Sequence, residues 1–172
     1  MTINKKPMSF SKSIKSTQVF PEHTNHLNTM FGGKILANID EIAAIAAMKH
    51  AETNCVTASI DSVNFLKPIR AGEIVTYEAY ISHVGTSSLE VCVQIKVDNP
   101  FTYQSDLAVL SFLTFVAVNE DGEKVEVPKV YPTNQHEEWL FKTADDRIQK
   151  RQDQRMKSKE MIEFLKSIEE QA

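Results

Sequence analysis

The chain has 172 residues, of which 42% are hydrophobic, with a formal net charge of −4 and a pI near 5.7. These values predict one globular domain with a proper core. They argue against general nucleic-acid binding, which usually requires a strongly basic face. No window approaches the roughly 18 consecutive apolar residues of a membrane span, and no N-terminal stretch is apolar enough for a secretory signal. Cys55 and Cys92, each within an apolar run, are expected to be reduced thiols of a cytoplasmic protein.

Strand patterns precede and follow one long helical segment. Residues 1–10 are expected to be flexible, residues 11–20 alternate weakly as a first strand, and residues 21–31 form a polar loop. A helix is predicted from Gly33 to near Thr53, because alanine, leucine, isoleucine and methionine dominate and no proline interrupts. Four β-rich runs follow, at residues 55–65, 74–84, 89–97 and 107–118. This order predicts an α+β fold in which an antiparallel sheet wraps around a long central helix.

The C-terminal part, residues 136–172, has a different composition. Its middle is strongly charged, and apolar residues return only towards its end. The pattern predicts a long, largely solvated C-terminal helix. Its charges are expected to form a solvated face, with a phosphate-binding or assembly role as the alternative.

A glycine pair, Gly32-Gly33, opens the predicted helix, and Asp40 lies on its apolar face. At about 100° per residue, Asp40 falls roughly 140° from the centre of the polar stripe that carries Glu41. We therefore expect Glu41 to be solvated and Asp40 to be buried among alanines. A carboxylate in such surroundings must be hydrogen-bonded, neutralised or used in chemistry. The structural alternative is a simple hydrogen bond to a backbone amide or hydroxyl.

The start of this helix presents unpaired backbone N–H groups and a partial positive charge. Because Gly32 and Gly33 carry no side chains, a ligand carbonyl can approach these amides and become polarised. Asp40 lies near 10 Å further along, at 1.5 Å per residue, so it is not expected to touch the same substrate atom. A second copy of the helix, packed antiparallel across a dimer axis, could bring the partner's carboxylate to this end.

Other polar residues are weaker candidates. Asn25 lies in the polar loop and could equally be a turn former. Thr57, Ser59 and Asp61 are expected to share one face of a strand. No metal site is expected, since the histidines of the loop have no second ligand pair at metal spacing.

Phosphate-binding candidates lie at two chain reversals. Lys67, Arg70 and the turn Gly85-Thr86-Ser87-Ser88 could hold phosphates, although such turns usually only reverse a chain. No nucleophile elbow, phosphate-binding loop or dinucleotide fingerprint is present.

Several motifs in fixed order resemble the hotdog-fold acyl-CoA thioesterases, in the branch of the cytosolic (brain-type) acyl-CoA hydrolase and its bacterial relatives. These motifs are Thr24-Asn25, Phe31-Gly32-Gly33-Lys34, Asp40-Glu41, Val56-Thr57-Ala58-Ser59-Ile60-Asp61, Asn64-Phe65 with Pro68-Ile69-Arg70-Ala71-Gly72, Val84-Gly85-Thr86-Ser87-Ser88, Thr114-Phe115-Val116-Ala117-Val118, and Val127-Pro128 with Pro132. The resemblance covers residues 11–132 as a hotdog domain and leaves 133–172 as a C-terminal helical extension.

The resemblance implies hydrolysis of fatty acyl-CoA to free fatty acid and coenzyme A, without a cofactor or metal. It implies a catalytic Asn25 and a catalytic Asp40 from opposite subunits, assisted by Thr57, with the thioester carbonyl facing Gly32-Gly33. Asp40 would act as general base or as nucleophile, and the sequence leaves both open.

The same resemblance implies coenzyme A contacts at two places and a defined assembly. Arg70 and the segment Thr86-Ser87-Ser88 match regions that approach the nucleotide in relatives, and Lys67 lies beside the first of them. The implied assembly is a homodimer at least, built into a hexamer as a trimer of dimers.

Three other readings compete. A non-catalytic acyl-CoA-binding regulator on the same fold would not need both Asn25 and Asp40. A hydratase would need an aspartate and a histidine close together in one loop, and His23 and His26 lack a suitably placed aspartate. A scaffold protein would use the C-terminal helix for assembly.

Overall fold

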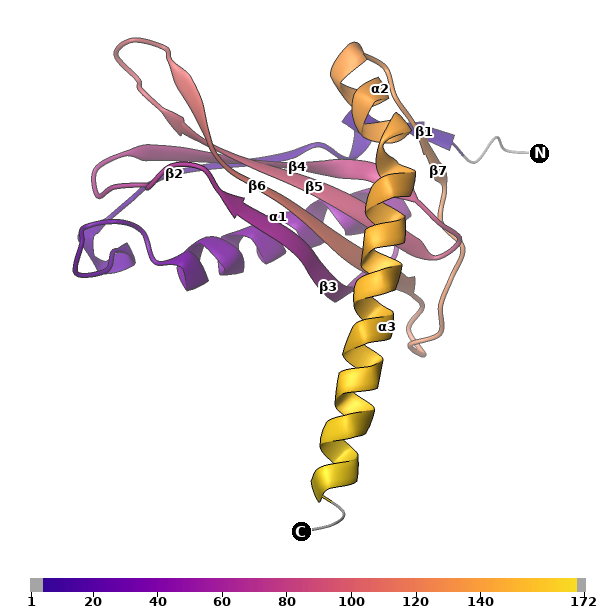
Figure 1. The fold of residues 1–172 in the computed structure, drawn as a ribbon. Helices are drawn as coiled ribbons and strands as arrows, with labels where there is room; N and C mark the ends of the chain where they lie inside the picture. The colour runs from indigo at the N-terminus through magenta and orange to yellow at the C-terminus, as the bar shows by residue number, and fades with distance from the viewer. Residues whose placement is uncertain (1–4, 170–172) are drawn as a thin grey trace.

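The computed structural model describes residues 5–169, in which a five-stranded antiparallel sheet packs one face against the long helix α1 (Gly32–Ala51) (Figure 1). The strands are β2 (Ser13–Gln18), β3 (Asn54–Phe65), β4 (Ile74–Val84), β5 (Ser88–Asp98) and β6 (Ser105–Val118). Their spatial order is β2-β4-β5-β6-β3, so β2 and β3 are the two edges. The predicted α+β architecture, a sheet around a central helix, is confirmed.

The core lies between α1 and what we call the inner face of the sheet. Ala43, Ala46 and Ala47 of α1 are fully buried, and their small side chains let the helix lie close to the strands. Alternate residues of β4, β5 and β6 face them, because side chains change sides at each strand residue. Among the largest buried ones are Tyr77, Ile81, Leu89, Ile95, Leu113 and Phe115.

Residues 5–10 pack against this body, so the prediction of a flexible N-terminus is wrong for them; residues 1–4 lie outside the described range. Strand β1 (Lys5–Pro7) pairs in parallel with β7 (Lys129–Tyr131), and the 3₁₀ turn η1 (Met8–Ser11) follows. Met8 is fully buried, and Ser11 Oγ accepts a hydrogen bond from the Ile81 amide at 2.9 Å. One buried methionine in a short polar segment has no periodicity, which is why the sequence pattern missed it. A second 3₁₀ turn, η2 (Pro21–His23), begins the predicted loop.

The C-terminal extension forms two helices, α2 (Gln135–Lys142) and α3 (Ala144–Glu169), where one was predicted. Asn134 caps α2 by accepting a hydrogen bond from the Glu137 amide at 3.0 Å. The first half of α3 packs on the outer face of the sheet, opposite α1, and the second half projects away from the body (Figure 1). Within residues 5–169, no helix is long and apolar enough to cross a membrane.

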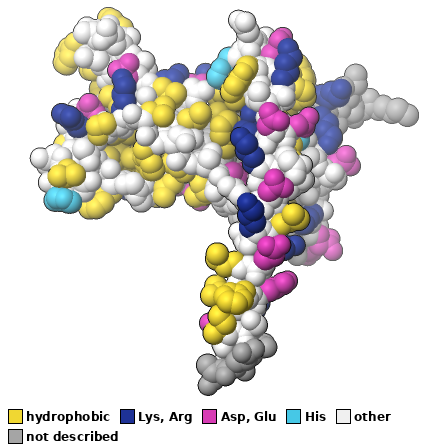
Figure 2. Space-filling view, in the orientation of Figure 1, with side chains coloured by type: hydrophobic (Ala, Val, Ile, Leu, Met, Phe, Trp, Pro, Cys, Tyr) yellow, Lys and Arg dark blue, Asp and Glu magenta, His cyan; other side chains and the backbone are white. Residues whose placement is uncertain are grey.

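The prediction of a solvated charged face holds for most of α3 and is wrong for Arg147 and Arg151. Arg147 donates to Glu90 Oε1 from two nitrogens, at 3.1 and 2.8 Å, and Arg151 forms ion pairs with Asp61 and Glu90 at 3.1 and 3.3 Å. The projecting half carries exposed apolar side chains (Figure 2): Met156, Met161, Ile162, Phe164, Leu165 and Ile168.

Candidate active site

Asp40 and Thr57 meet where α1 lies against β3. Thr57 Oγ1 donates a hydrogen bond of 2.8 Å to Asp40 Oδ1. Within residues 5–169, Asp40 Oδ2 accepts no hydrogen bond, so it is available to water or substrate. Asp40 is half-buried, not buried as predicted, because the sheet covers only one side of α1. Glu41 is exposed as predicted and pairs with Lys15 at 3.2 Å.

Two bulges in β3 separate side chains that were predicted to share a face. Thr57 pairs with Phe115 and Ser59 pairs with Thr114, so Ala58 is an extra residue in β3. Phe115 belongs to the inner core, which places Thr57 on the inner face beside Asp40. Asp61 instead contacts Arg151 on the outer face. The predicted common face is therefore wrong, because the alternation rule fails at a bulge.

Asn25 organises the loop that precedes α1. Its Oδ1 accepts hydrogen bonds from the Leu27 amide at 2.9 Å and from the Thr29 amide at 3.3 Å. The turn-former interpretation is thus correct for the oxygen. Within residues 5–169, Nδ2 of Asn25 has no hydrogen-bond partner, which leaves the two N–H donors of a half-buried side chain free for a ligand.

The amino end of α1 is open to a ligand. The helix begins at Gly32, and Phe31 ahead of it provides no side-chain cap. A Cβ placed on Gly33 would meet nothing within 4 Å, and one on Gly32 would meet only the Phe65 ring at 3.7 Å. Beside this end is a pocket of about 350 Å³, whose apolar lining includes Met30, Ile35, Phe65, Leu66 and Ile69. Free amides thus adjoin an apolar pocket, which suits a polar carbonyl attached to a hydrocarbon chain.

The predicted coenzyme A contacts lie at opposite ends of strand β4. Arg70 is exposed, has no ion pair within residues 5–169, and precedes β4. Lys67 lies near it but is paired with Asp106 at 2.8 Å. The turn Thr86-Ser87-Ser88 follows β4, whose 11 residues span about 35 Å. One chain therefore does not bring this turn to Arg70. Within the chain, the carbonyls of Thr86 and Ser87 accept hydrogen bonds from backbone amides.

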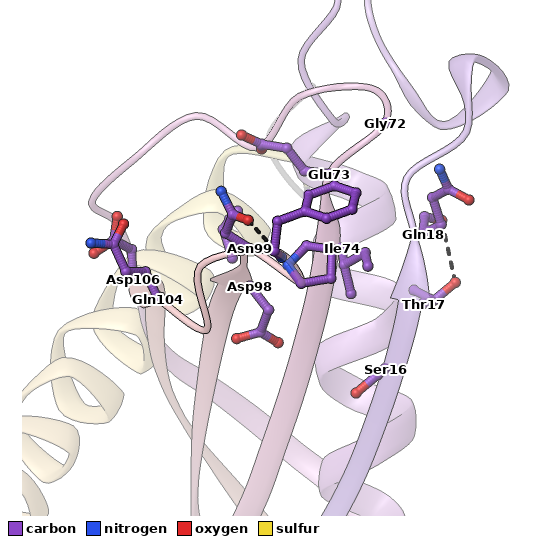
Figure 3. A pocket seen from close by; sticks show the side chains of 13 residues that line it. Ser16, Thr17, Gln18, Gly72, Glu73, Ile74, Asp98, Asn99, Gln104 and Asp106 are labelled. Atoms are coloured by element: carbon purple, nitrogen blue, oxygen red, sulfur yellow. Dashed lines mark hydrogen bonds between the residues drawn. The ribbon is translucent and has the colours of Figure 1, made fainter.

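A larger pocket, of about 700 Å³, lies elsewhere, between β2, β4 and the β5–β6 hairpin (Figure 3). Figure 3 shows Glu73, Asp98 and Asp106 around it, and none of the predicted site residues lines it. These carboxylates would repel the phosphates of a nucleotide. Size alone therefore does not identify the functional pocket.

The two cysteines are excluded as nucleophiles. Burial raises the pKa of the Cys55 thiol to about 11 and that of Cys92 to about 12, so both stay protonated near neutral pH. Both are free thiols, as predicted. Among residues 5–169, no group of three or more histidine, cysteine, aspartate or glutamate side chains is arranged to hold a metal ion.

The outer-face network of Asp61, Glu90, Arg147 and Arg151 received no role from the sequence. The strand pattern contained no signal for it: residues 88–98 alternate, and Glu90 falls on the same side as Gln94 and Lys96, where an acid is ordinary.

Comparisons with known proteins identify the class to which this fold and site belong. Residues 27–100 match the family model of the Thioesterase superfamily. The chain is 44% identical over 155 residues to an uncharacterized acyl-CoA thioester hydrolase of Bacillus subtilis, with 90% of each chain covered. The chain therefore belongs to the thioesterase superfamily and has the hotdog fold that its motifs predicted.

Two further relatives define the branch. An acyl-CoA hydrolase from Staphylococcus aureus, solved in complex with butyryl coenzyme A, coenzyme A and coenzyme A disulfide, is 55% identical with a TM-score of 0.92; 94% of this chain and 98% of that chain are covered. The cytosolic acyl coenzyme A thioester hydrolase of Rattus norvegicus is 31% identical over 143 residues, and the matched part spans 37% of that longer protein.

Proposed function

We propose that this chain is an acyl-CoA thioesterase that hydrolyses fatty acyl-CoA to free fatty acid and coenzyme A. The hydrogen bond from Thr57 to Asp40 carries this proposal, because it orients one carboxylate oxygen and leaves the other free to act on water or a thioester. The free carboxylate oxygen would activate water as a general base or attack the thioester as a nucleophile. Membership of the thioesterase superfamily supports the reaction class.

The other site residues take complementary roles. The thioester carbonyl would accept hydrogen bonds at the Gly32-Gly33 end of α1, where negative charge develops during attack. The free Nδ2 of Asn25 would orient the water or the carbonyl. The acyl chain would enter the apolar pocket beside Phe65. These roles need neither a metal nor a cofactor.

Three variants of the S. aureus hydrolase support this set of residues. Solved structures carry an alanine at an asparagine, an aspartate or a threonine of that enzyme, and each matches this chain at 54% identity with a TM-score of 0.91 or 0.92. The three positions are separated by 15 and 17 residues. Asn25, Asp40 and Thr57 have the same separations (from 25 to 40 and from 40 to 57).

We further propose that each site is shared between two chains. Eight residues of helix, about 12 Å, separate Gly32 from Asp40. The edge strand β3 exposes Val56 and Ile60, and α1 exposes Ile45 and Met48, so a second copy would cover both. Antiparallel pairing of two β3 edges would bring the partner's Asp40 towards the glycine end. It would also bring the partner's Thr86-Ser87-Ser88 turn towards Arg70 and so complete a coenzyme A site.

A trimer of such dimers is the proposed assembly. A solved apo-hexameric acyl-CoA thioesterase supports it, with 44% identity and a TM-score of 0.84 over 87% of this chain and 96% of that chain. The cytosolic mammalian relatives support a cytoplasmic location.

Release of free thiol from a panel of acyl-CoA thioesters tests the reaction. Purified chain, dialysed against a chelator, is incubated with saturated acyl-CoA substrates from C2 to C18, and coenzyme A is measured with a thiol reagent. We expect turnover on part of this panel. A protein that binds these thioesters but releases no thiol would instead be the non-catalytic regulator.

A further inference from the structure

We infer that Arg151 of α3 is a positioning residue for the candidate active site. Its ion pair with Asp61 on the outer face holds the bulged segment of β3 that directly follows Thr57, the residue that bonds Asp40 on the inner face. The kinetic test of this inference rests on the proposed function, whereas its structural test does not.

The first bulge of β3, at Ala58, directly follows Thr57, the residue that reaches Asp40. On a regular strand, Thr57 and Ser59 would point to the same side of the sheet. Their partners on β6, Phe115 and Thr114, lie on opposite faces, so the extra residue reverses the sides. Cys55 and Thr57 alternate regularly on the inner face, so Ser59 is the residue that the bulge turns outward. A shift of the bulged segment would move the adjoining Thr57 hydroxyl away from the carboxylate that it contacts.

Asp61 is the extra residue of a second bulge, because Ile60 pairs with Leu113 and Ser62 pairs with Phe112. Its carboxylate accepts hydrogen bonds from Ser59 Oγ at 2.5 Å, from Thr114 Oγ1 at 2.6 Å and from Arg151 Nη1 at 3.1 Å. The first contact lies within the bulged segment, the second joins the segment to β6, and the third joins it to α3. The segment between Thr57 and Asp61 is thus anchored at both ends, once on each face of the sheet.

Arg151 supplies the positive charge in this set. The side chains of Asp61 and Arg151 are only 11% and 13% exposed, so water screens the pair weakly. Without Arg151, a nearly buried carboxylate would keep only two neutral donors, and it would have to move outward to regain water. Glu90, the second partner of Arg151, would still be paired with Arg147, so the loss falls on Asp61.

The two bulges explain why a side-chain anchor matters here. They interrupt the ladder between β3 and β6 next to Thr57. The contacts of Asp61 hold the strand to β6 and α3 at this interruption, whether or not a second copy pairs at the other edge. A displacement of about 1 Å at a reacting group can cost roughly 100-fold in rate.

The kinetic test compares Arg151→Met with Arg155→Met, one turn further along α3. Arg155 is exposed and makes no hydrogen bond or ion pair within residues 5–169, so its variant is the matched control. With butyryl-CoA as substrate, Arg151→Met should lower kcat by about tenfold or more and leave KM within about twofold, and the control should change neither. Wild-type kcat in folded Arg151→Met would overturn the inference.

A double-mutant cycle separates positioning from general damage. Because Arg151 is inferred to act through Thr57, Arg151→Met should lower kcat little further, by less than about twofold, in a Thr57→Ala background. Losses that multiply in the double variant would mean that Arg151 acts independently of Thr57, and the inference would be wrong.

Two further measurements keep the test decisive if Arg151→Met folds poorly or if the wild-type protein releases no coenzyme A. The double variant Asp61→Asn/Arg151→Met removes both charges and so avoids an unpaired buried carboxylate. It should fold and keep the loss of kcat; recovery to the wild-type value would count against the ion pair. A crystal structure of this double variant should show the bond between Thr57 and Asp40 broken. An intact bulge and an intact bond would overturn the inference whether or not the proposed function is correct.

Discussion

Nε2 of His50 lies 2.8 Å from the carbonyl oxygen of Pro128, and this contact joins the last turn of α1 to the segment ahead of β7. His50 is fully buried, and its Nδ1 has no hydrogen-bond partner among residues 5–169. Burial lowers the pKa of this imidazole, an effect that the Pro128 carbonyl and Glu52 oppose and Lys6 reinforces. The folded protein therefore favours neutral His50.

We expect acid to destabilise the fold through His50. An unfolded histidine titrates near pH 6.5. Below that pH the histidine of the unfolded chain binds a proton, whereas buried His50 of the folded protein stays neutral. The free energy of unfolding should then fall by up to about 1.4 kcal/mol per pH unit. Calorimetry at about pH 7.5 and 5.5 should show a smaller fall in Tm for His50→Gln than for the wild type. Part of the fall should persist, since burial also lowers the pKa of His83. Equal falls in both proteins would exclude His50.

Asp40→Asn should abolish most activity without loss of the fold. The amide can still accept the hydrogen bond from Thr57, but it cannot take a proton from water or attack a thioester. We expect kcat to drop by about 100-fold or more with unchanged circular dichroism. Glu41→Gln, one residue further along and exposed, is the matched control and should retain wild-type kcat. An Asp40→Asn variant with normal turnover would remove this residue from the mechanism.

Mixing two inactive variants should restore activity if the site is shared. In a dimer of one Asn25→Ala chain and one Asp40→Asn chain, one site contains neither substitution and the other contains both. Chains mixed under conditions of subunit exchange should therefore regain part of the wild-type rate. Demonstrated exchange without any recovered rate would place the whole site within one chain.

The edge strand β3 should be the surface at which two copies pair. A charge at Ile60, which is 43% exposed on this edge, would be buried in the pairing interface and should weaken it. Light scattering of Ile60→Glu should shift towards the monomer mass of 19.4 kDa. Ile14→Glu, on the opposite edge strand β2, is the control and should keep the wild-type mass. A wild-type protein of monomer mass would rule out every proposed assembly.

Arg70→Ala should weaken recognition of the nucleotide part of coenzyme A. The exposed guanidinium can bind a phosphate, although the chain as a whole is acidic. We expect a higher KM for acyl-CoA at nearly constant kcat, and little change for short acyl-pantetheine thioesters, which lack the nucleotide. Equal losses on both substrates would make Arg70 a structural residue of its turn.

The sequence was sufficient for the arrangement of α1 and for its contact with β3. The run of helix-forming residues after Gly33 defined the helix, and helical periodicity separated Asp40 from Glu41. The contact of Thr57 with Asp40 followed from the family resemblance. Strand periodicity alone predicted a shared face for Thr57 and Asp61, and the structure contradicts it. A bulge depends on the partner strand, so it has no signature in the strand itself.

The ion pairs that anchor α3 to the sheet were also not predictable from the sequence. Arg151 lies 90 residues from Asp61 and Arg147 lies 57 residues from Glu90, so no local spacing indicates either pair. In a helix rich in both charges, these two arginines have the same pattern as their solvated neighbours. Only the fold decides which charges lie over the sheet.

The strand order also imposes a sequence of events on the growing chain. Among the described strands β3 pairs only with β6, and Asn54 lies opposite Val118. During synthesis, α1 and β3 therefore leave the ribosome well before the strand that will fix β3 in the sheet. Until then the alanine-rich face of α1 has no complete sheet to cover it, and β3 offers a free edge. Pairing between strands so far apart in sequence slows folding. Self-association therefore competes most strongly with correct assembly while β6 has not yet been synthesised.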